Sequence, residues 1–218
     1  PFDDARVRRA LALAIDRGVL TDKILRKSAV PAYTMVPGSV SRYTRPVPEY
    51  AGAPMPARQA EARKLLAEAG FGAGKPLKFT MQYFTEAKTR TLAVAMVSMW
   101  RAVGVQCELV NKDLGSVISS VRAGSFEVSL YAWFSSFDDP STFLDILTTK
   151  PRGSLSGYSN PAFDQAFTAG NGLGSLDERN AALARAEALA MADTPVIPLF
   201  TGINQRLVSN KVQGWSDN

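Results

Sequence analysis

Hydrophobic residues recur at helical spacing from the start of the chain. One helix face is formed by Val7, Ala10, Leu11, Ala14 and Ile15. Residues 3–26 are therefore expected to be helical, with Asp3 or Asp4 as the N-cap. A break near residues 16–18, which end in a glycine, would divide this stretch into two helices.

The next part of the chain alternates between two periodicities. Residues 57–69 and 88–103 have the helical pattern, and each stretch is followed by a glycine that can end a helix. Residues 77–84 and 105–110 alternate between apolar and polar side chains, which is typical of half-buried strands. This strand–helix–strand order predicts a β-α-β unit with parallel strands and a right-handed crossover.

Helix-start signals dominate the second half of the chain. A short helix is expected over 113–123, and a third strand follows with apolar alternation at Phe126, Val128, Leu130 and Ala132. Asp139-Pro140 and Asn160-Pro161 each look like an N-cap followed by a proline in the first helical turn.

The last elements are a helix and a strand. Residues 175–178 read as a capping box that opens a helix ending near Met191. Residues 195–200 read as a final buried strand, with 206–208 adding a little more. Residues 28–56, by contrast, carry six prolines and are expected to be irregular, either as a surface connection or as a functional segment.

Together these patterns predict an α/β fold in which helices flank a mixed β-sheet. We treat residues 1–218 as a single lobe. The first four residues already resemble a helix start, so we expect the chain to begin inside a longer polypeptide.

Composition excludes several protein classes. Hydrophobic residues make up 46% of the chain and charged residues 21%, which is ordinary for a globular protein and wrong for disorder. No apolar run approaches the ~18 residues of a membrane-spanning helix. The net charge is +5, but the basic residues are scattered, so the basic stripe of a nucleic-acid-binding protein is missing.

The residue types needed for common catalytic sites are also missing. The chain has no histidine, which excludes Ser-His-Asp and Cys-His mechanisms and His-ligated metals within it. Its one cysteine, Cys107, falls on the apolar face of a strand and is expected to be a buried structural thiol. Neither a catalytic residue, a metal ligand nor a cofactor site is predicted.

The best candidate site is the segment that leaves the third strand and enters the next helix. Ligands of open α/β sheets bind outside the carboxyl ends of strands, and aromatic faces with small hydroxyls suit an organic ligand. The candidate ligand-binding residues are Trp133, Phe134, Ser135, Ser136, Phe137 and Asp138. An alternative to ligand binding remains open for Trp133, which could simply pack under a helix. The neighbouring Asp139 is expected to cap a helix rather than to bind a ligand.

The order of these segments resembles the C-terminal lobe of family 5 extracellular solute-binding proteins, the peptide- and nickel-type receptors of ABC importers. The likeness spans nearly the whole chain. It is carried by residues 1–11, 14–17, 62–70, 100–105, 124–133, Asp139-Pro140, Tyr158-Ser159-Asn160-Pro161-Ala162-Phe163-Asp164 and Pro195-Val196-Ile197-Pro198-Leu199.

The resemblance implies a type II periplasmic-binding-protein fold and a mechanism without covalent chemistry. Two lobes would close on a peptide or similar solute outside the cytoplasm and present it to a membrane ABC permease. This chain would supply one wall of the site, and the N-terminal lobe would lie outside it. The resemblance implies no enzyme activity, no cofactor and no nucleic-acid partner.

One position departs from the family pattern. Many peptide-binding relatives have an aspartate three residues after the counterpart of Trp133, where it pairs with the amino terminus of the peptide. Ser136 stands there in this chain, and a hydroxyl cannot neutralise an ammonium group. Either Asp138 replaces that aspartate, or the ligand has no free amine there, as in blocked peptides, sugars or opines. Nickel is a less favoured ligand.

Two other classes of function compete with an importer receptor. The same lobe could serve as the ligand-sensing module of a regulatory protein, and a helix-turn-helix upstream would favour that alternative. A signal peptide or lipobox cysteine upstream would favour the receptor. A hydrolase would need a nucleophile and a base that converge, and the sequence offers no such pair.

Overall fold

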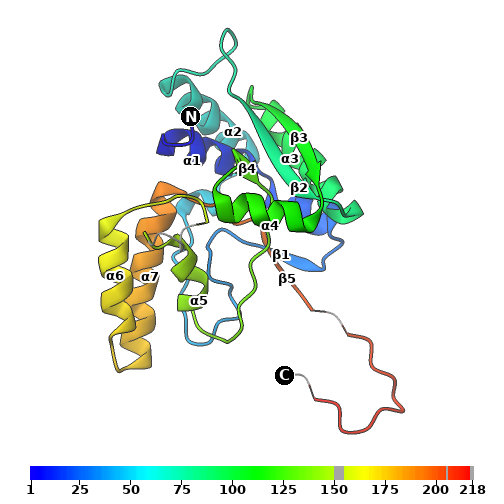
Figure 1. The fold of residues 1–218 in the computed structure, drawn as a ribbon, viewed down its shortest axis with the longest axis vertical. Helices are drawn as coiled ribbons and strands as arrows, with labels where there is room; N and C mark the ends of the chain where they lie inside the picture. Colours follow the sequence, from blue (N-terminus) through cyan, green and yellow to red (C-terminus); the bar gives the residue numbers. More distant parts are fainter. Residues whose placement is uncertain (150–154, 205, 217–218) are drawn as a thin grey trace.

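The computed structural model describes residues 1–149, 155–204 and 206–216. Its central sheet has three parallel strands, β2 (Lys78–Phe84), β3 (Gln106–Lys112) and β4 (Val128–Ser129), in the order β3-β2-β4 (Figure 1). Strands β2 and β3 pair along their whole length, from Lys78 opposite Gln106 to Phe84 opposite Lys112. Helix α3 (Ala87–Arg101) connects them, which confirms the predicted β-α-β unit.

Strand β4 is much shorter than the alternation over 126–132 predicts. The Glu127 carboxylate accepts hydrogen bonds from the Thr80 amide at 2.8 Å and the Thr80 hydroxyl at 2.7 Å, so a side chain takes the place of a ladder bond. After the Leu130 amide donates to the Gln82 carbonyl at 2.9 Å, the chain leaves the sheet. The predicted long strand is therefore wrong at both ends.

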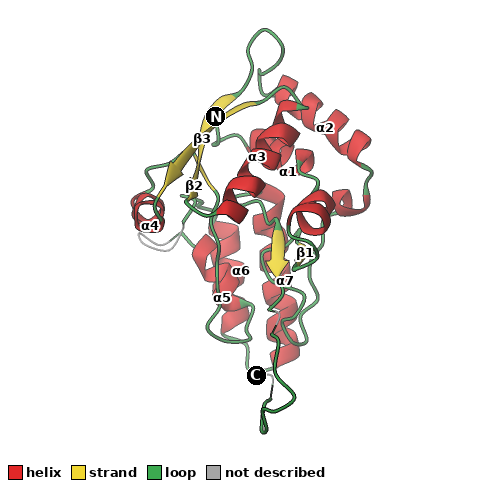
Figure 2. Ribbon diagram, turned by 90° about the vertical axis from the view of Figure 1, so that its right-hand side faces the viewer, coloured by secondary structure: helices red, strands yellow, loops and turns green. Residues whose placement is uncertain are grey.

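Helices cover both faces of this sheet. Helices α1 (Ala5–Ala14), α2 (Met55–Glu68) and α3 lie on one side, and α4 (Leu114–Ala123) lies on the other (Figure 2). Asp4 caps α1 by accepting the Arg6 amide at 2.9 Å. The predicted break after α1 is present and leads into a π-helical segment, Val19–Ile24.

The main hydrophobic core lies between the sheet and helices α1 to α3. Trp100 is fully buried in it, packs edge-on against Phe79 with ring centroids 5.4 Å apart, and donates its indole N–H to the Leu11 carbonyl at 3.1 Å. Two arginines, Arg17 and Arg58, are buried beside this core, and sequence reasoning did not predict their burial. Arg17 donates to the carbonyls of Ala32 at 2.7 Å and Pro198 at 2.8 Å.

The proline-rich stretch 28–56 is mostly irregular, as predicted. It contains β1 (Ala29–Pro31) and a 3-10 turn at Glu49–Gly52. Strand β1 pairs antiparallel with β5 (Phe200–Gly202), the strand nearest the chain end among the described residues. The strand predicted over 195–200 therefore overlaps β5 only at Phe200, because Pro195 and Pro198 have no amide to donate. Residues 206–208 form no strand.

The remaining helices of the described chain lie in its second half. The short helix α5 (Ser141–Leu144) continues into a 3-10 turn, Asp145–Leu147, and α6 (Pro161–Asn171) and α7 (Leu176–Asp193) form an antiparallel hairpin beside it (Figure 1). As predicted, the Asn160 side chain caps α6. The capping box before α7 is not formed, because the Ser175 side chain makes no cap bond.

A second hydrophobic core holds this hairpin to the proline-rich stretch. It contains Val36, Leu147, Phe163, Phe167 and Leu183. No helix of the described residues has the length and apolarity to cross a membrane.

Candidate functional site

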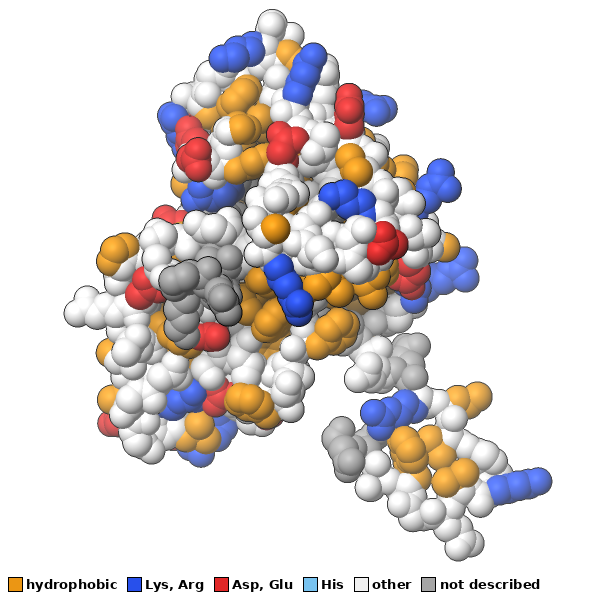
Figure 3. All heavy atoms as spheres, viewed as in Figure 1, with side chains coloured by type: hydrophobic (Ala, Val, Ile, Leu, Met, Phe, Trp, Pro, Cys, Tyr) orange, Lys and Arg blue, Asp and Glu red, His pale blue; other side chains and the backbone are white. Residues whose placement is uncertain are grey.

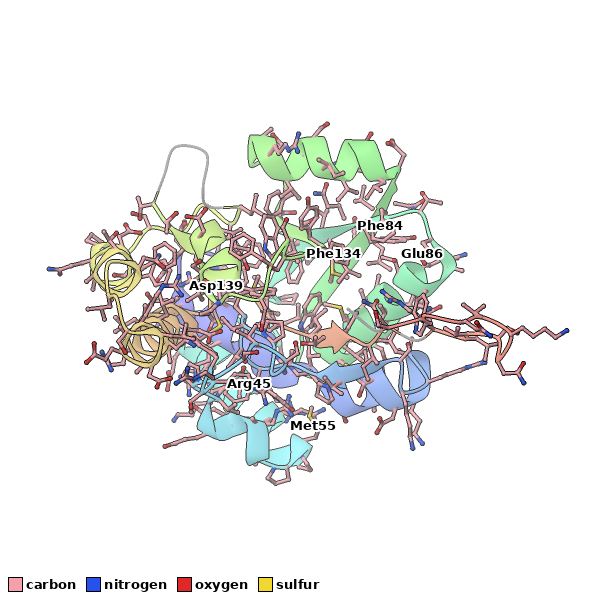
Figure 4. All side chains as sticks on the ribbon, turned by 90° about the horizontal axis from the view of Figure 1, so that it is seen from below. Arg45, Met55, Phe84, Glu86, Phe134 and Asp139 are labelled. Atoms are coloured by element: carbon pink, nitrogen blue, oxygen red, sulfur yellow. The ribbon has the colours of Figure 1, made fainter. Side chains whose placement is uncertain are left out.

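Residues 131–138, which we call the wall segment, leave the carboxyl end of β4 and run to α5. In Figure 4, Phe134 lies between the end of the sheet, marked by Phe84, and the start of α5, marked by Asp139. Phe134 is 84% exposed, Phe137 62% and Trp133 39%, which is unusual for large apolar side chains. Figure 3 shows hydrophobic side chains gathered below α4, on the face crossed by this segment.

The first half of the wall segment has an open backbone. Among the described residues, no hydrogen bond engages the backbone of residues 131–134. Buried backbone groups are almost always paired, so an open row at the surface must bond to water or to a ligand. These four residues continue directly from a strand and can accept an extended chain by strand addition.

Trp133 has an anchored edge and an open face. Its indole N–H donates to the Thr142 carbonyl in α5 at 2.9 Å. Trp133 therefore contacts a helix, as the alternative of packing under a helix predicted, yet more than a third of its surface is exposed to solvent.

The two serines of the wall segment have different environments. The Ser135 hydroxyl bonds to the Thr142 hydroxyl at 2.7 Å and also to the backbone of Phe137, so it shapes the turn. Ser136 is exposed, and its hydroxyl bonds to none of the described residues. Of the two, Ser136 is the one available to a ligand.

The adjacent aspartates also differ. Asp139 accepts the amide of Ser141, the first residue of α5, at 2.8 Å, but the N-cap position is occupied by Pro140 and not by Asp139 as predicted. Asp139 also binds Arg179 of α7 through both carboxylate oxygens, at 2.7 and 3.0 Å. Burial acts to raise the pKa of Asp139, but the bonds from Arg179 and Ser141 outweigh it and lower the pKa. Asp138 is exposed, and among the described residues its carboxylate accepts only the Ser41 amide, at 3.3 Å. Neither Arg179 nor Ser41 was found by sequence reasoning, because both are distant in the chain.

Two hollows lie elsewhere on the sheet. One of about 470 Å³ is at the carboxyl ends of β2 and β3, with Glu86 and Arg90 in its lining. The other, of about 350 Å³, is at the amino ends and includes Cys107. Cys107 is half-buried rather than fully buried as predicted, and burial raises the pKa of its thiol to about 11. Across the described residues, no group of three or more acidic or cysteine side chains could hold a metal ion.

Comparisons with known proteins agree on one family. The family model "Bacterial extracellular solute-binding proteins, family 5 Middle" matches residues 1–154. The periplasmic murein peptide-binding protein MppA of Escherichia coli is 33% identical over the whole chain. The periplasmic oligopeptide-binding protein OppA of Haemophilus influenzae is also 33% identical, over 99% of the chain. This chain spans 41% of the length of each of these relatives.

Solved structures show the same relationship. The structure of H. influenzae OppA in complex with the peptide RPPGFSPFR matches 99% of this chain with a TM-score of 0.91, and this chain covers 43% of it. OppA of Burkholderia pseudomallei matches 98% of the chain, at 35% identity and a TM-score of 0.92, and 43% of it is covered. The predicted α/β lobe of the periplasmic-binding-protein type is thereby confirmed.

Proposed function

Because the chain belongs to the bacterial extracellular solute-binding proteins of family 5, we propose that it binds a peptide or peptide-like solute for an ABC importer. Residues 1–218 would form the C-terminal lobe of a longer receptor. A second lobe would close over the ligand, and the closed form would dock on the membrane permease. The relatives named above are periplasmic, so the proposed site of action lies outside the cytoplasm.

The observation that carries this proposal is the open backbone of residues 131–134 beside exposed aromatic rings. An extended peptide can add to such a segment through main-chain hydrogen bonds, and its side chains can rest on Trp133 and Phe134. Main-chain bonds read no sequence, so this arrangement suits a receptor for many peptides. H. influenzae OppA was solved with a nine-residue peptide, which supports a peptide ligand.

We assign ligand contact to Trp133, Phe134, Ser136 and Phe137, whose side chains are exposed. Ser135 supports the turn that presents them. Asp138 remains a polar contact whose carboxylate is already shared with Ser41.

The proposed activity is binding without chemistry. MppA of E. coli and OppA of H. influenzae are both peptide-binding proteins. Cys107, the one thiol of the chain, has a raised pKa, and only the thiolate form attacks as a nucleophile. The second candidate function is a sensor built on the same lobe, and the same binding site would serve it.

Native mass spectrometry of the gently purified full-length parent tests the proposal. The native mass should exceed the denatured mass by that of a peptide or of another small solute. A peptide adduct supports the peptide receptor, and a non-peptide adduct redirects the ligand class. If neither an adduct nor binding of added di- to nonapeptides is observed, the proposed function is wrong.

A further inference from the structure

The wall segment contributes little packing of its own, so something else must hold it in place. All four of its aromatic residues, Tyr131, Trp133, Phe134 and Phe137, are exposed, and the backbone of residues 131–134 bonds to none of the described residues. A site that accepts a ligand by strand addition needs this backbone held in one direction. A flexible segment would lose conformational entropy when the ligand binds, and that loss would weaken the affinity. Thr142 of α5 holds Trp133 and Ser135 directly, and further contacts come from α7.

The first contact is direct. Arg179 of α7 binds both carboxylate oxygens of Asp139, the residue that follows the wall segment. The side chains are only 17% and 21% exposed, so this pair is better shielded from water than an ordinary surface pair. Arg179 also donates to the Asn171 side chain in α6 at 2.7 Å, which fixes the guanidinium from the hairpin side.

The second contact passes through the proline-rich stretch. Asn180, the next residue of α7, is buried and donates to the carbonyls of Ser41 at 3.3 Å and Arg42 at 3.2 Å. The Ser41 amide in turn donates to Asp138, inside the wall segment. This route is longer and weaker than the first.

A third contact fastens the same loop further along. Glu187, two helical turns after Asn180, is fully buried. Its carboxylate accepts the Val36 amide and the Tyr43 hydroxyl, each at 2.8 Å. The loop that carries Ser41 is therefore held on both sides of that residue by one face of α7.

We propose that Arg179, Asn180 and Glu187 form a positioning frame on α7 that sets the direction of the wall segment without touching the ligand. The name "wall segment" rests on the proposed function, but the mechanical coupling does not. Changes in this helix should therefore alter the environment of Trp133 while the sheet core stays intact.

The test uses indole N–H signals in NMR spectra of the full-length parent, labelled with ¹⁵N-tryptophan and free of added ligand. Trp133→Phe assigns the Trp133 signal, and Trp100→Phe assigns the signal of the buried Trp100. Arg179→Ala should shift or broaden the Trp133 signal strongly, because it releases Asp139 and α5, which holds the indole. Asn180→Ala should have a smaller effect in the same direction.

Arg185→Ala is the matched control, because Arg185 is an exposed arginine of the same helix. It should leave the Trp133 signal in place. An unchanged Trp133 signal in both Arg179→Ala and Asn180→Ala overturns the frame. If Arg179→Ala also shifts the Trp100 signal, the variant has lost its fold and Arg179→Lys replaces it. Lysine keeps the positive charge but cannot bind both carboxylate oxygens of Asp139 at once. A shifted Trp133 signal with an unchanged Trp100 signal in Arg179→Lys supports the frame.

Two substitutions of Glu187 separate a positioning role from a general effect on stability. Glu187→Gln keeps an acceptor for the Val36 amide and a polar partner for Tyr43, so the Trp133 signal should stay near its wild-type position. Glu187→Ala should shift it. If Glu187→Ala leaves both the Trp133 and the Trp100 signals unchanged, Glu187 has no positioning role. The measurement needs no ligand, so a failure here and a failure of peptide binding are told apart.

Discussion

At the residue scale, Trp133 combines an anchored edge with an open face. Replacing it with alanine in the intact protein removes the open aromatic surface and the bond to Thr142. We expect ligand affinity to fall at least several-fold, equivalent to about 1–2 kcal/mol for a partly exposed aromatic contact. Isothermal titration calorimetry with the ligand recovered from the parent measures this loss.

Trp133→Phe is the control for this prediction, because it keeps an aromatic face but loses the indole N–H. Its affinity should fall between those of the wild type and Trp133→Ala. Unchanged affinity in a correctly folded Trp133→Ala protein would remove this segment from the site.

In the proposed site, Ser136 would determine which end of a ligand this wall can accept. Its hydroxyl bonds to no other side chain or backbone group in the part of the chain that the structure describes, while Asp139 is paired with Arg179 and Asp138 accepts from Ser41. Ser136→Asp should raise the affinity for a free-amine peptide over its N-acetylated counterpart by about tenfold, because a charge-assisted bond replaces a neutral one. The ratio of the two dissociation constants is the measurement.

Asp138→Asn tests the alternative partner for a ligand amine. If the wild type already prefers peptides with a free amine and Asp138→Asn abolishes that preference, Asp138 is the residue that pairs with the ligand amine. Ser136→Asp should then add little to the preference. A wild type without a preference points to ligands that lack a free amine at this end.

At the element scale, α7 carries a buried carboxyl group whose effect on stability depends on pH. Burial raises the pKa of Glu187 above its ordinary value, although bonds from Val36 and Tyr43 oppose the rise. The unfolded chain loses this proton at a lower pH than the folded chain does. Stability should therefore fall as pH rises from the unfolded pKa, near 4.3, toward the folded one.

Glu187→Gln removes this titration. The free energy of unfolding of the variant, relative to wild type, should increase between pH 4 and pH 7, as measured by urea unfolding of the intact protein. Glu178→Gln, at an exposed position of the same helix, is the matched control and should show no such trend. A pH-independent difference for Glu187→Gln would mean that the carboxyl titrates normally in the folded state.

The elements that the sequence predicts well are those set by local chemistry. Asn160-Pro161 identifies the start of α6, and the alternation over 77–84 locates β2, because caps and periodicity act within a few residues. What the sequence hides depends on distant partners. The bond that truncates β4 joins Glu127 to Thr80, and the pair that holds the wall joins Arg179 to Asp139, 40 residues away.

The same reasoning applies to the candidate site. The six residues of the site prediction fall on one exposed segment because they are consecutive and follow a strand. Their accessibility could not be predicted, since alternation alone cannot tell whether Trp133 faces a helix or solvent. The buried Arg17 and Arg58 escaped notice because arginine is almost never fully buried.

At the scale of the whole chain, contacts between its first and last parts close the fold. Arg8 of α1 donates to the carbonyls of Phe2 at 2.6 Å and Asp193 at 2.9 Å, and Arg17 joins Ala32 to Pro198. Two hydrophobic cores lie in the part of the chain that these contacts join. We therefore expect residues 1–218 to fold without the rest of the parent protein, which circular dichroism and a cooperative thermal transition would show.

Folding alone should not bring tight binding. A ligand on the wall segment would be covered on one side only, whereas ligand sites usually bury most of the ligand surface. We expect the isolated chain to bind the parent's ligand at least about 100-fold more weakly, a loss of roughly 2.7 kcal/mol. Calorimetry on the two proteins, with the same ligand and buffer, gives the ratio. Equal affinities would mean that this lobe holds the entire site, and closure would then serve only to signal occupancy to a partner.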